Sequence, residues 1–388
     1  MKAVGIIAEY NPFHNGHKYH AEMARKQAQA DVVVAVMSGN FTQRGEPAIV
    51  DKWQRAEMAL SNGIDLVIEL PYRYAVQPAD IFASGGVSVL NQLGCEAIAF
   101  GVETDDHKKL LDIAIFYSEN EAEIEKALLA TEENKVFAER FADALSHVSG
   151  ERMDTSLWSK PNNQLAIQYL LANNRLAKPL EPIFIQRFKS EHGDLATNNR
   201  TIASGTAIRH LATTNQSIKN FVPRESYAML EQQKLITIAD FWPYLKYQLS
   251  IYDAQSLRNI YQMTEGLEHR LLQQFDVDMT FKDYLEAVKS KRYTYARLTR
   301  LLNYVLVKIS NEEMLKEQPV PMRLLGFNKT GQTFLNEIKN KQGKKVISRL
   351  SKDAIDDFEL DIRAGNVYRL VDSDHIGKQD FDRIPVIK

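Results

Sequence analysis

The first half of the chain alternates apolar runs of strand length with segments of helical periodicity. Each apolar run is almost uninterrupted, which is typical of strands that are covered on both faces of a sheet. Repeated strand and helix units predict a parallel, doubly wound sheet with right-handed crossovers. We therefore expect an α/β fold built on a five-stranded parallel sheet. The predicted strands lie at 3–8, 32–37, 65–70, 97–101 and 182–188, and the predicted helices at about 16–29, 51–62 and 78–93.

Helical patterns dominate the rest of the chain. Residues from about 105 to 175, with an acidic stretch at 119–139, are expected to form a helical insertion in the first domain. After residue 209 the chain is helical, aromatic and basic, with short strand-like segments only around 343–370. We place a first domain at 1–220 and a second, mainly α-helical domain at 221–388.

One predicted helix of the second domain carries two different faces. Its leucine-rich stripe is expected to face the core, whereas cations and aromatic rings share the opposite face, which we expect to be exposed. Such a face suits RNA phosphates and unstacked bases, although a solvated helix surface also explains it. The stripe consists of Leu298, Leu301, Leu302, Val305 and Ile309, the opposite face of Tyr293, Arg297, Arg300 and Tyr304, and Lys339, Lys341, Lys344 and Lys345 could extend it.

Composition narrows the class of protein. The chain has 388 residues, of which 44% are hydrophobic and 25% charged, as in ordinary globular proteins. The single cysteine, Cys95, excludes an intrachain disulfide and a Cys-rich zinc site. The chain enters a strand at once, and no apolar run reaches membrane-spanning length, so we expect a cytoplasmic protein with no membrane partner.

Charge is unevenly distributed along a chain whose formal net charge is only −2. Residues 1–210 carry 21 basic against 27 acidic side chains, whereas residues 211–388 carry 27 against 23. Basic patches lie at 282–308 and 323–349, with seven basic residues each. These patches fit a local contact with nucleic acid or a solvated helix face.

The junction after the first strand is the most informative motif. Residues 11–17 read Asn-Pro-Phe-His-Asn-Gly-His and lie where a buried strand turns into a helix. Free backbone N–H groups and the helix dipole attract phosphate at such a turn. His14 and His17, three residues apart, fall on one side of the first helical turn and can donate to phosphate oxygens. The alternative is that both histidines merely cap a helix.

A second motif, at 202–209, reads Ile-Ala-Ser-Gly-Thr-Ala-Ile-Arg. Its hydroxyl side chains can cap a helix whose first turn contains Arg209, which makes a second phosphate cradle. The alternative is a hydroxyl-capped surface helix with a solvated arginine. Together the two motifs resemble the paired signature of the nucleotidylyl transferase superfamily, which grips a triphosphate.

Three turns follow predicted strands and should converge on one crevice at the carboxyl ends of the sheet. They are the histidine turn, Ser38-Gly39-Asn40 and Gly101-Val102-Glu103. A further turn, Ser159-Lys160-Pro161-Asn162-Asn163, precedes a helix, and its amides could contact a nucleotide or only cap that helix.

Longer blocks resemble one family, the bacterial tRNA(Met) cytidine acetate ligases. The blocks occur in the family's order over nearly the whole chain, and the resemblance is weakest after about residue 345 and in the acidic insertion. They are Glu9-Tyr10-Asn11-Pro12-Phe13-His14-Asn15-Gly16-His17, residues 37–48 (Met-Ser-Gly-Asn-Phe-Thr-Gln-Arg-Gly-Glu-Pro-Ala), residues 65–71 (Asp-Leu-Val-Ile-Glu-Leu-Pro), Lys160-Pro161-Asn162-Asn163 and Ser290-Lys291-Arg292-Tyr293-Thr294.

The resemblance implies an ATP-dependent ligase with a nucleotidylyl transferase core. Such enzymes activate acetate as acetyl-adenylate and transfer the acetyl group to N4 of the wobble cytidine of elongator tRNA(Met). It implies catalytic roles for His14, His17 and Arg209. The implied ATP contacts are Ile7, Ala8, Glu9, Tyr10, Asn11, Pro12, Phe13, His14, Asn15, Gly16, His17, Lys18, Tyr19, His20, Gly101, Asn162, Arg187, Ser204, Thr206 and Arg209.

We expect the acetate pocket beside the end of the second strand, at Ser38, Gly39, Asn40 and Gln43. The predicted tRNA contacts are Lys291, Arg292, Tyr293, Arg297, Arg300, Lys344 and Lys345, and no DNA is expected. The sequence shows no dedicated metal-ligand cluster, so Mg²⁺ is expected to be held by the ATP phosphates.

Two other classes of protein share these motifs. One is an adenylyltransferase or carboxylate–amine ligase that acts on a small metabolite, and the other is a non-catalytic tRNA-binding protein with a vestigial ATP site. The large basic second domain disfavours the first alternative, and the two intact phosphate motifs disfavour the second.

Overall fold

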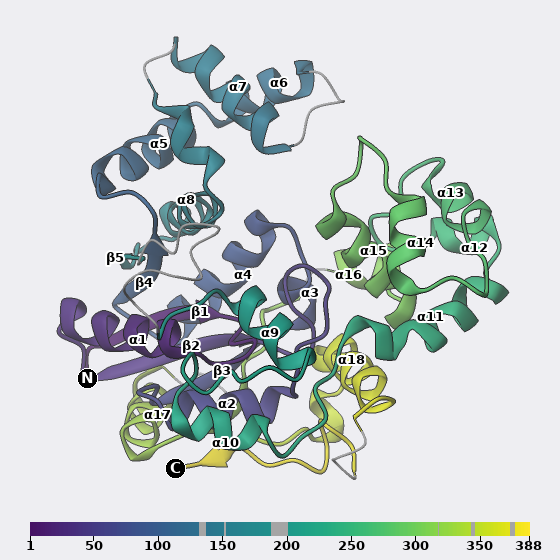
Figure 1. Cartoon of the computed structure of the whole chain (residues 1–388). Helices are drawn as coiled ribbons and strands as arrows, with labels where there is room; N and C mark the ends of the chain where they lie inside the picture. Colours follow the sequence, from purple (N-terminus) through teal and green to yellow (C-terminus); the bar gives the residue numbers. More distant parts are fainter. Residues whose placement is uncertain (132–136, 151–152, 188–200, 317, 343–345, 373–376) are drawn as a thin grey trace.

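A computed structural model describes residues 1–388 except 132–136, 151–152, 188–200, 317, 343–345 and 373–376. Its centre is a seven-stranded sheet with the strand order β5-β4-β1-β2-β3-β6-β7 (Figure 1). The first five strands are parallel, whereas β6 runs antiparallel to β3. The strands are β1 Ala3–Ala8, β2 Val32–Ser38, β3 Leu66–Leu70, β4 Ala97–Val102, β5 Glu181–Gln186, β6 Arg323–Phe327 and β7 Val386–Ile387.

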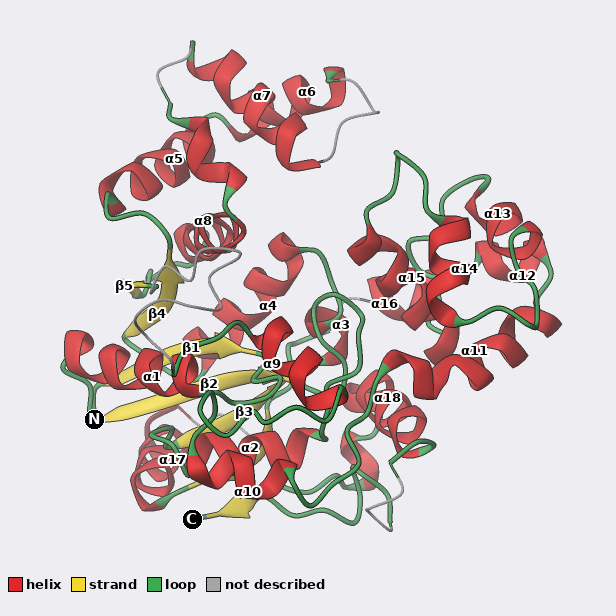
Figure 2. Cartoon of the chain, viewed as in Figure 1, coloured by secondary structure: helices red, strands yellow, loops and turns green. Residues whose placement is uncertain are grey.

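Helices cover both faces of the sheet (Figure 2). Alternate residues of β2 pack in two different cores. Val34 packs in one core with helices α4 (Ala79–Gln92) and α8 (Pro161–Asn174), and Ala35 packs in the other with helices α1 (Asn15–Ala28) and α2 (Lys52–Leu60). This two-sided burial is the reason that the strands are apolar without alternation. The helices around the sheet are α1 Asn15–Ala28, α2 Lys52–Leu60, α3 Tyr72–Ala75, α4 Ala79–Gln92, α8 Pro161–Asn174, α9 Gly205–Thr213, α10 Arg224–Leu230 and α17 Lys329–Gln342.

Two helical groups extend from this sheet. The predicted insertion after β4 is helical, as expected, and its outer helices stand apart from the sheet in Figure 1. The second group has its own apolar core, which also includes Phe41 and Tyr72 from the first half of the chain. The insertion contains α5 His107–Glu119, α6 Glu121–Ala130, α7 Phe137–Ser149 and the short helix η1 Thr155–Ser159; the second group contains α11 Ile238–Ile251, α12 Ala254–Arg258, α13 Leu267–Gln273, α14 Phe281–Val288, α15 Tyr295–Val307, α16 Asn311–Leu315 and α18 Glu359–Arg369, with η2 Lys352–Ala354 and η3 Asp356–Phe358 before α18.

The expectation of a five-stranded sheet is wrong, because the C-terminal region adds two strands. β6 has only five residues, includes an arginine, and obtains its ladder hydrogen bonds from the edge of β3, a partner more than 250 residues away. Such pairing leaves no local sequence signal. The expectation of short strand-like segments around 343–370 is also wrong in part, because residues 359–369 form helix α18. The division at residue 220 remains an expectation.

The expectation that the basic and aromatic face of α15 is exposed is wrong for three of its four residues. Arg300 is 9% exposed, Tyr293 6% and Tyr304 0%, and only Arg297 is partly exposed, whereas the burial of the leucine stripe is confirmed. The reason is a tertiary contact: the face packs against the loop after β2, where Asn303 Nδ2 donates to Gly45 O at 3.0 Å. A Cβ at Gly45 would lie 2.6 Å from Arg300 Cα, so the loop and helix are in direct contact.

Lys339, which was expected to extend this surface, does not do so. Lys339 is on α17, which packs against β2, β3 and β6, well away from α15 in Figure 1. Lys344 and Lys345 lie outside the described residues. Among the helices that are described, none is long and apolar enough to cross a membrane.

Candidate active site

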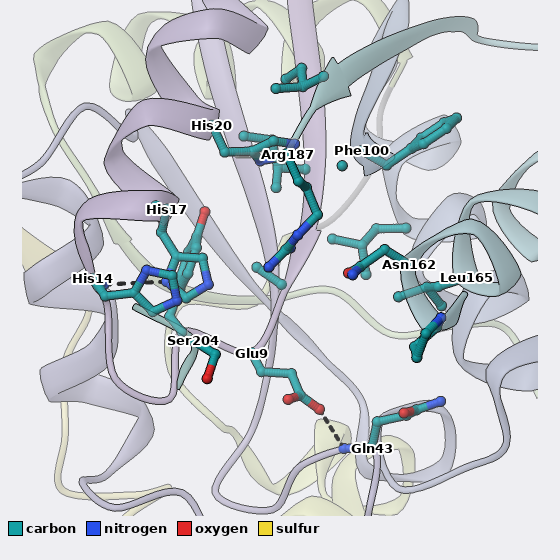
Figure 3. A pocket seen from close by; sticks show the side chains of 18 of the residues that line it. Glu9, His14, His17, His20, Gln43, Phe100, Asn162, Leu165, Arg187 and Ser204 are labelled. Carbon is teal, nitrogen blue, oxygen red and sulfur yellow. Dashed lines mark hydrogen bonds between the residues drawn. The ribbon is translucent and has the colours of Figure 1, made fainter. Parts of the chain in front are cut away.

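A cavity of about 450 Å³ opens at the carboxyl ends of β1, β4 and β5. The first turns of α1 and α8 and the segment before α9 complete its wall (Figure 3). The crevice therefore forms where a parallel sheet of this kind presents its ligand site. Its predicted lining residues are Ile7, Ala8, Glu9, Tyr10, His14, Gly16, His17, Tyr19, His20, Gln43, Gly101, Asn162, Arg187 and Ser204.

The histidine turn forms one end of the cavity. The rings of His14 and His17 stack with centroids 3.6 Å apart, and the backbone N–H of His14 donates to His17 Nδ1 at 3.3 Å. A Cβ at Gly16 would lie 2.9 Å from His14 Cε1, so this glycine makes room for the ring. The accepting Nδ1 places the proton of neutral His17 on Nε2, and the ring also has a hydrogen bond with the backbone of Pro12.

Burial keeps these histidines neutral. Desolvation, with the charges of Arg187 and Arg209, lowers the pKa of His14 to about 3. Desolvation and the charge of Arg187 lower the pKa of His20 to about 4, and desolvation with the neighbouring His14 lowers the pKa of His17 well below its usual value. At neutral pH the three rings therefore offer N–H donors without positive charge. An anion that entered the cavity would raise all three pKa values.

Arg187 and Asn162 face each other across the cavity. Arg187 follows β5, where its backbone N–H donates to Val102 O at 2.9 Å, and its side chain points into the cavity (Figure 3). A Cβ at Gly101 would lie only 3.1 Å from Arg187 Cγ, so Gly101 leaves space for the arginine stem. Asn162, in the first turn of α8, donates through Nδ2 to Glu103 Oε1 at 2.5 Å. Asn162 thus reaches the cavity and does more than cap a helix.

The second motif lies beside the histidine turn. Ser204 caps α9 by accepting the N–H of Ala207 at 3.2 Å, as predicted. Arg209 connects the second motif to the histidine turn. Its Nη1 donates to Asn11 O at 3.0 Å, and its Nη2 donates to Thr206 Oγ1 at 3.3 Å. A Cβ at Gly205 would lie 3.9 Å from His14 Nε2. The N-termini of α1 and α9 therefore meet at one end of the cavity.

Several predicted residues do not line the cavity. Ser38 and Asn40 are buried beneath it: the buried guanidinium of Arg55 donates to Ser38 O at 3.0 Å and to Gly39 O, while Lys52 N donates to Asn40 Oδ1 at 2.8 Å. Of the residues expected to form the acetate pocket, Gln43 alone lines this cavity, and the position of the acetate pocket stays a prediction. The other predicted residues outside its lining are Asn11, Pro12, Phe13, Asn15, Lys18, Thr206 and Arg209.

Sequence reasoning missed some lining residues. Phe100 precedes Gly101 on β4, Gln186 ends β5 just before Arg187, and Arg44 follows Gln43, so adjacency to predicted residues was their only signal. Phe82, Leu165 and Tyr169 come from helices α4 and α8 and carry no local motif. Among the residues that the structure describes, no group of three or more histidine, cysteine or acidic side chains could hold a metal ion.

Fold and site together define a class. A parallel sheet whose first strand leads into His-Asn-Gly-His, with a second helix N-terminus beside it, is the arrangement of a nucleotidyl transferase. The family model described as HIGH Nucleotidyl Transferase matches residues 1–383.

More specific relatives cover the whole chain. The tRNA(Met) cytidine acetate ligase of Bacillus subtilis (strain 168) is 40% identical over 95% of this chain and 92% of its own length. The ligase of the same name from Ligilactobacillus salivarius is 39% identical over all of both chains. The chain belongs to the tRNA(Met) cytidine acetate ligase family.

Solved structures agree with this relationship. The crystal structure of Thermotoga maritima TmcAL in its apo form I superposes with a TM-score of 0.90, at 29% identity over 100% of this chain and 99% of that one. Thermotoga maritima TmcAL bound with alpha-thio ATP gives a TM-score of 0.89 with the same identity and coverage.

Proposed function

We propose that this chain is an ATP-dependent ligase of the cytoplasm that activates acetate as acetyl-adenylate and acetylates N4 of the wobble cytidine of elongator tRNA(Met). One observation carries the proposal: three histidines, Arg187 and two helix N-termini gather around one cavity at the carboxyl ends of the parallel strands. Membership of the ligase family and the relative bound with alpha-thio ATP support it.

In the first step an acetate oxygen attacks the α-phosphorus of ATP and pyrophosphate leaves. Charge accumulates on the phosphate oxygens, and prearranged N–H donors stabilise it without reorganisation. His14 and His17 are placed to donate to the reacting phosphate, while Ser204, Thr206 and Arg209 hold the β- and γ-phosphates from the start of α9. No nucleophile from the protein is required.

The remaining roles follow from position along the cavity. Gly101, Asn162 and Arg187 bind the rest of the nucleotide, and acetate lies on the side of Gln43. Mg²⁺ arrives with ATP and is held by its phosphates, whose oxygen atoms are the ligands that this ion prefers. The metal neutralises phosphate charge when it is bound, and no step of the proposal depends on its position.

Arginine side chains lie between the mouth of the cavity and α15, and they form the proposed contact with tRNA. Arg44 lines the cavity, and Arg300 Nη1 approaches Gln43 O at 3.5 Å. Burial lowers the pKa of Arg300, and the nearby charges of Arg297 and Arg44 lower it further. The guanidinium groups of Arg297 and Arg292 lie 4.7 and 5.7 Å from the ring centroid of Tyr293. RNA phosphates could pair with the exposed or partly exposed members of this set, which are Arg44, Arg292 and Arg297.

Product analysis tests the proposed function. The chain is incubated with ATP, labelled acetate and elongator tRNA(Met), and the digested tRNA is examined by mass spectrometry. We expect N4-acetylcytidine at the wobble position only when ATP and acetate are both present. A labelled small metabolite with unmodified tRNA would instead support a small-molecule ligase. Tight tRNA binding with neither product would support a non-catalytic protein.

A further inference from the structure

The cavity contains a carboxylate that activation of acetate does not use. Glu9 follows β1, and its side chain lies on the floor of the cavity between the histidine turn and Gln43 (Figure 3). Of the described residues that line the cavity, Glu9 is the only acidic one. A negative group beside a triphosphate and a second carboxylate does not help the first step, so its presence requires another explanation.

Glu9 is held in place by the backbone. The N–H of Gln43 donates to Glu9 Oε1 at 2.7 Å, and Arg55 Nη1 donates to the Glu9 carbonyl oxygen at 2.6 Å. No hydrogen bond to Oε2 from a described residue is present. Arg209, whose charge reaches Glu9, pairs instead with Glu46, with Nη2 to Oε2 at 3.8 Å. One oxygen is thus anchored and the other remains available to a ligand.

The other bases of the cavity are weak. The pKa values of His14 and His20 lie at about 3 and 4, and Nδ1 of His17 already accepts the N–H of His14. Burial, in contrast, raises the pKa of Glu9 against the lowering effects of the Gln43 N–H and of Arg209. Efficient proton acceptors have a pKa close to the working pH, and the shift of Glu9 is in that direction.

We propose that Glu9 accepts the proton of the cytidine N4 amine during acetyl transfer. This role rests on the proposed function. N4 attacks the acetyl carbonyl of acetyl-adenylate, a C–N bond forms, and the bond between the acetyl carbon and the phosphate oxygen breaks. AMP leaves with that electron pair, and the extra proton on nitrogen passes to Glu9 Oε2. The N4 lone pair is delocalised into the ring, so removal of this proton favours product over return to reactants.

Glu9→Gln is the decisive variant because it keeps the shape and an oxygen acceptor for Gln43 N–H but cannot accept a proton. Preformed acetyl-adenylate and tRNA(Met) are mixed with the variant or the parent protein in single-turnover experiments from pH 5 to 8.5. We expect the parent rate to rise with pH and then level off, since only the ionised Glu9 accepts a proton. The variant should be slower by about 10²- to 10⁴-fold and should lack this rise.

Glu46→Gln serves as the matched control. This variant removes a nearby negative charge that raises the pKa of Glu9, and it leaves Glu9 intact. The transfer rate should therefore still rise with pH, and the rise should occur at lower pH than in the parent protein. A melting curve of Glu9→Gln checks that it is folded.

The proposal is overturned if Glu9→Gln transfers acetyl within tenfold of the parent with the same pH profile, because Glu9 then only anchors the loop. It is also overturned if acetate-dependent pyrophosphate exchange falls as far as transfer does. A parent protein that forms no N4-acetylcytidine contradicts the proposed function itself, which is a different result.

Discussion

The histidine turn and helix α15 both carry a pattern of polar and aromatic residues at helical spacing, yet only at the turn do these side chains line a cavity, as the sequence predicts. At the turn, His14, Gly16 and His17 are within one helical turn of each other, so local geometry decides where they point. On α15, the opposite face meets a loop that is more than 250 residues away in the sequence. Local motifs fix a site, whereas the exposure of a helix face depends on distant contacts.

The largest expected effect is on the stability of the protein and concerns the buried face of helix α15. Tyr304 is fully buried and its hydroxyl donates to Val76 O, so we regard it as part of the core. Tyr304→Ala should lower the free energy of unfolding by about 3 to 5 kcal/mol, measured by urea denaturation. Tyr304→Phe removes only the hydrogen bond and should cost about 1 to 3 kcal/mol. A Phe variant with unchanged stability and weakened tRNA binding would restore the exposed-face interpretation.

The histidine turn should show the next largest effect, on catalysis instead of stability. His14→Ala or His17→Ala removes a donor that acts in the transition state, so acetate-dependent pyrophosphate exchange should fall about 10²- to 10³-fold in turnover, with a smaller change in the KM for ATP. His210→Ala, on the exposed side of α9, is the matched control and should exchange normally. Full exchange by a folded His14 or His17 variant would remove the catalytic role of that residue.

A charge reversal at Arg297 tests the proposed contact between α15 and tRNA. Unlike Arg300, it is only partly buried, so Arg297→Glu should weaken tRNA binding without unfolding the chain. If Arg297 contacts one phosphate, the slope of log K against log salt should decrease in magnitude by about one. Lys178→Glu, which precedes β5 and so lies at the end of the strand away from the cavity, should leave the slope unchanged. Equal slopes for both variants would place the tRNA elsewhere.

The smallest expected effect is a fractional proton uptake on ATP binding. In the free protein His14 and His20 are neutral at pH 6, because their pKa values lie at about 3 and 4. Phosphate charge favours the protonated rings and raises both values, so binding should take up protons and tighten as the pH falls from 7 toward 5.5. Calorimetry in buffers of different ionisation enthalpy measures the uptake. His14→Gln should reduce it, and identical uptake by variant and parent would contradict the assignment.

The sequence predicts the parallel core well because each element has its own local signal. The five apolar runs are strands within a residue or two at most ends, and both motifs begin helices as expected. The strand β6 and the burial of α15 could not be predicted, because both depend on contacts between distant parts of the chain. The burial of Ser38 and Gly39 could not be predicted either, because it depends on Arg55 of α2, which donates to both of their carbonyl oxygens.

The central claim is that the cavity beside the histidine turn activates a small carboxylate with ATP. Exchange of radiolabelled pyrophosphate into ATP, measured with the full chain across formate, acetate, propionate, butyrate and a set of amino acids, tests this claim most directly. We predict exchange that requires a carboxylic acid, is fastest with acetate and declines for larger acids, because the cavity must also hold ATP. Exchange that proceeds equally well with no carboxylate, or only with an amino acid, would contradict the account.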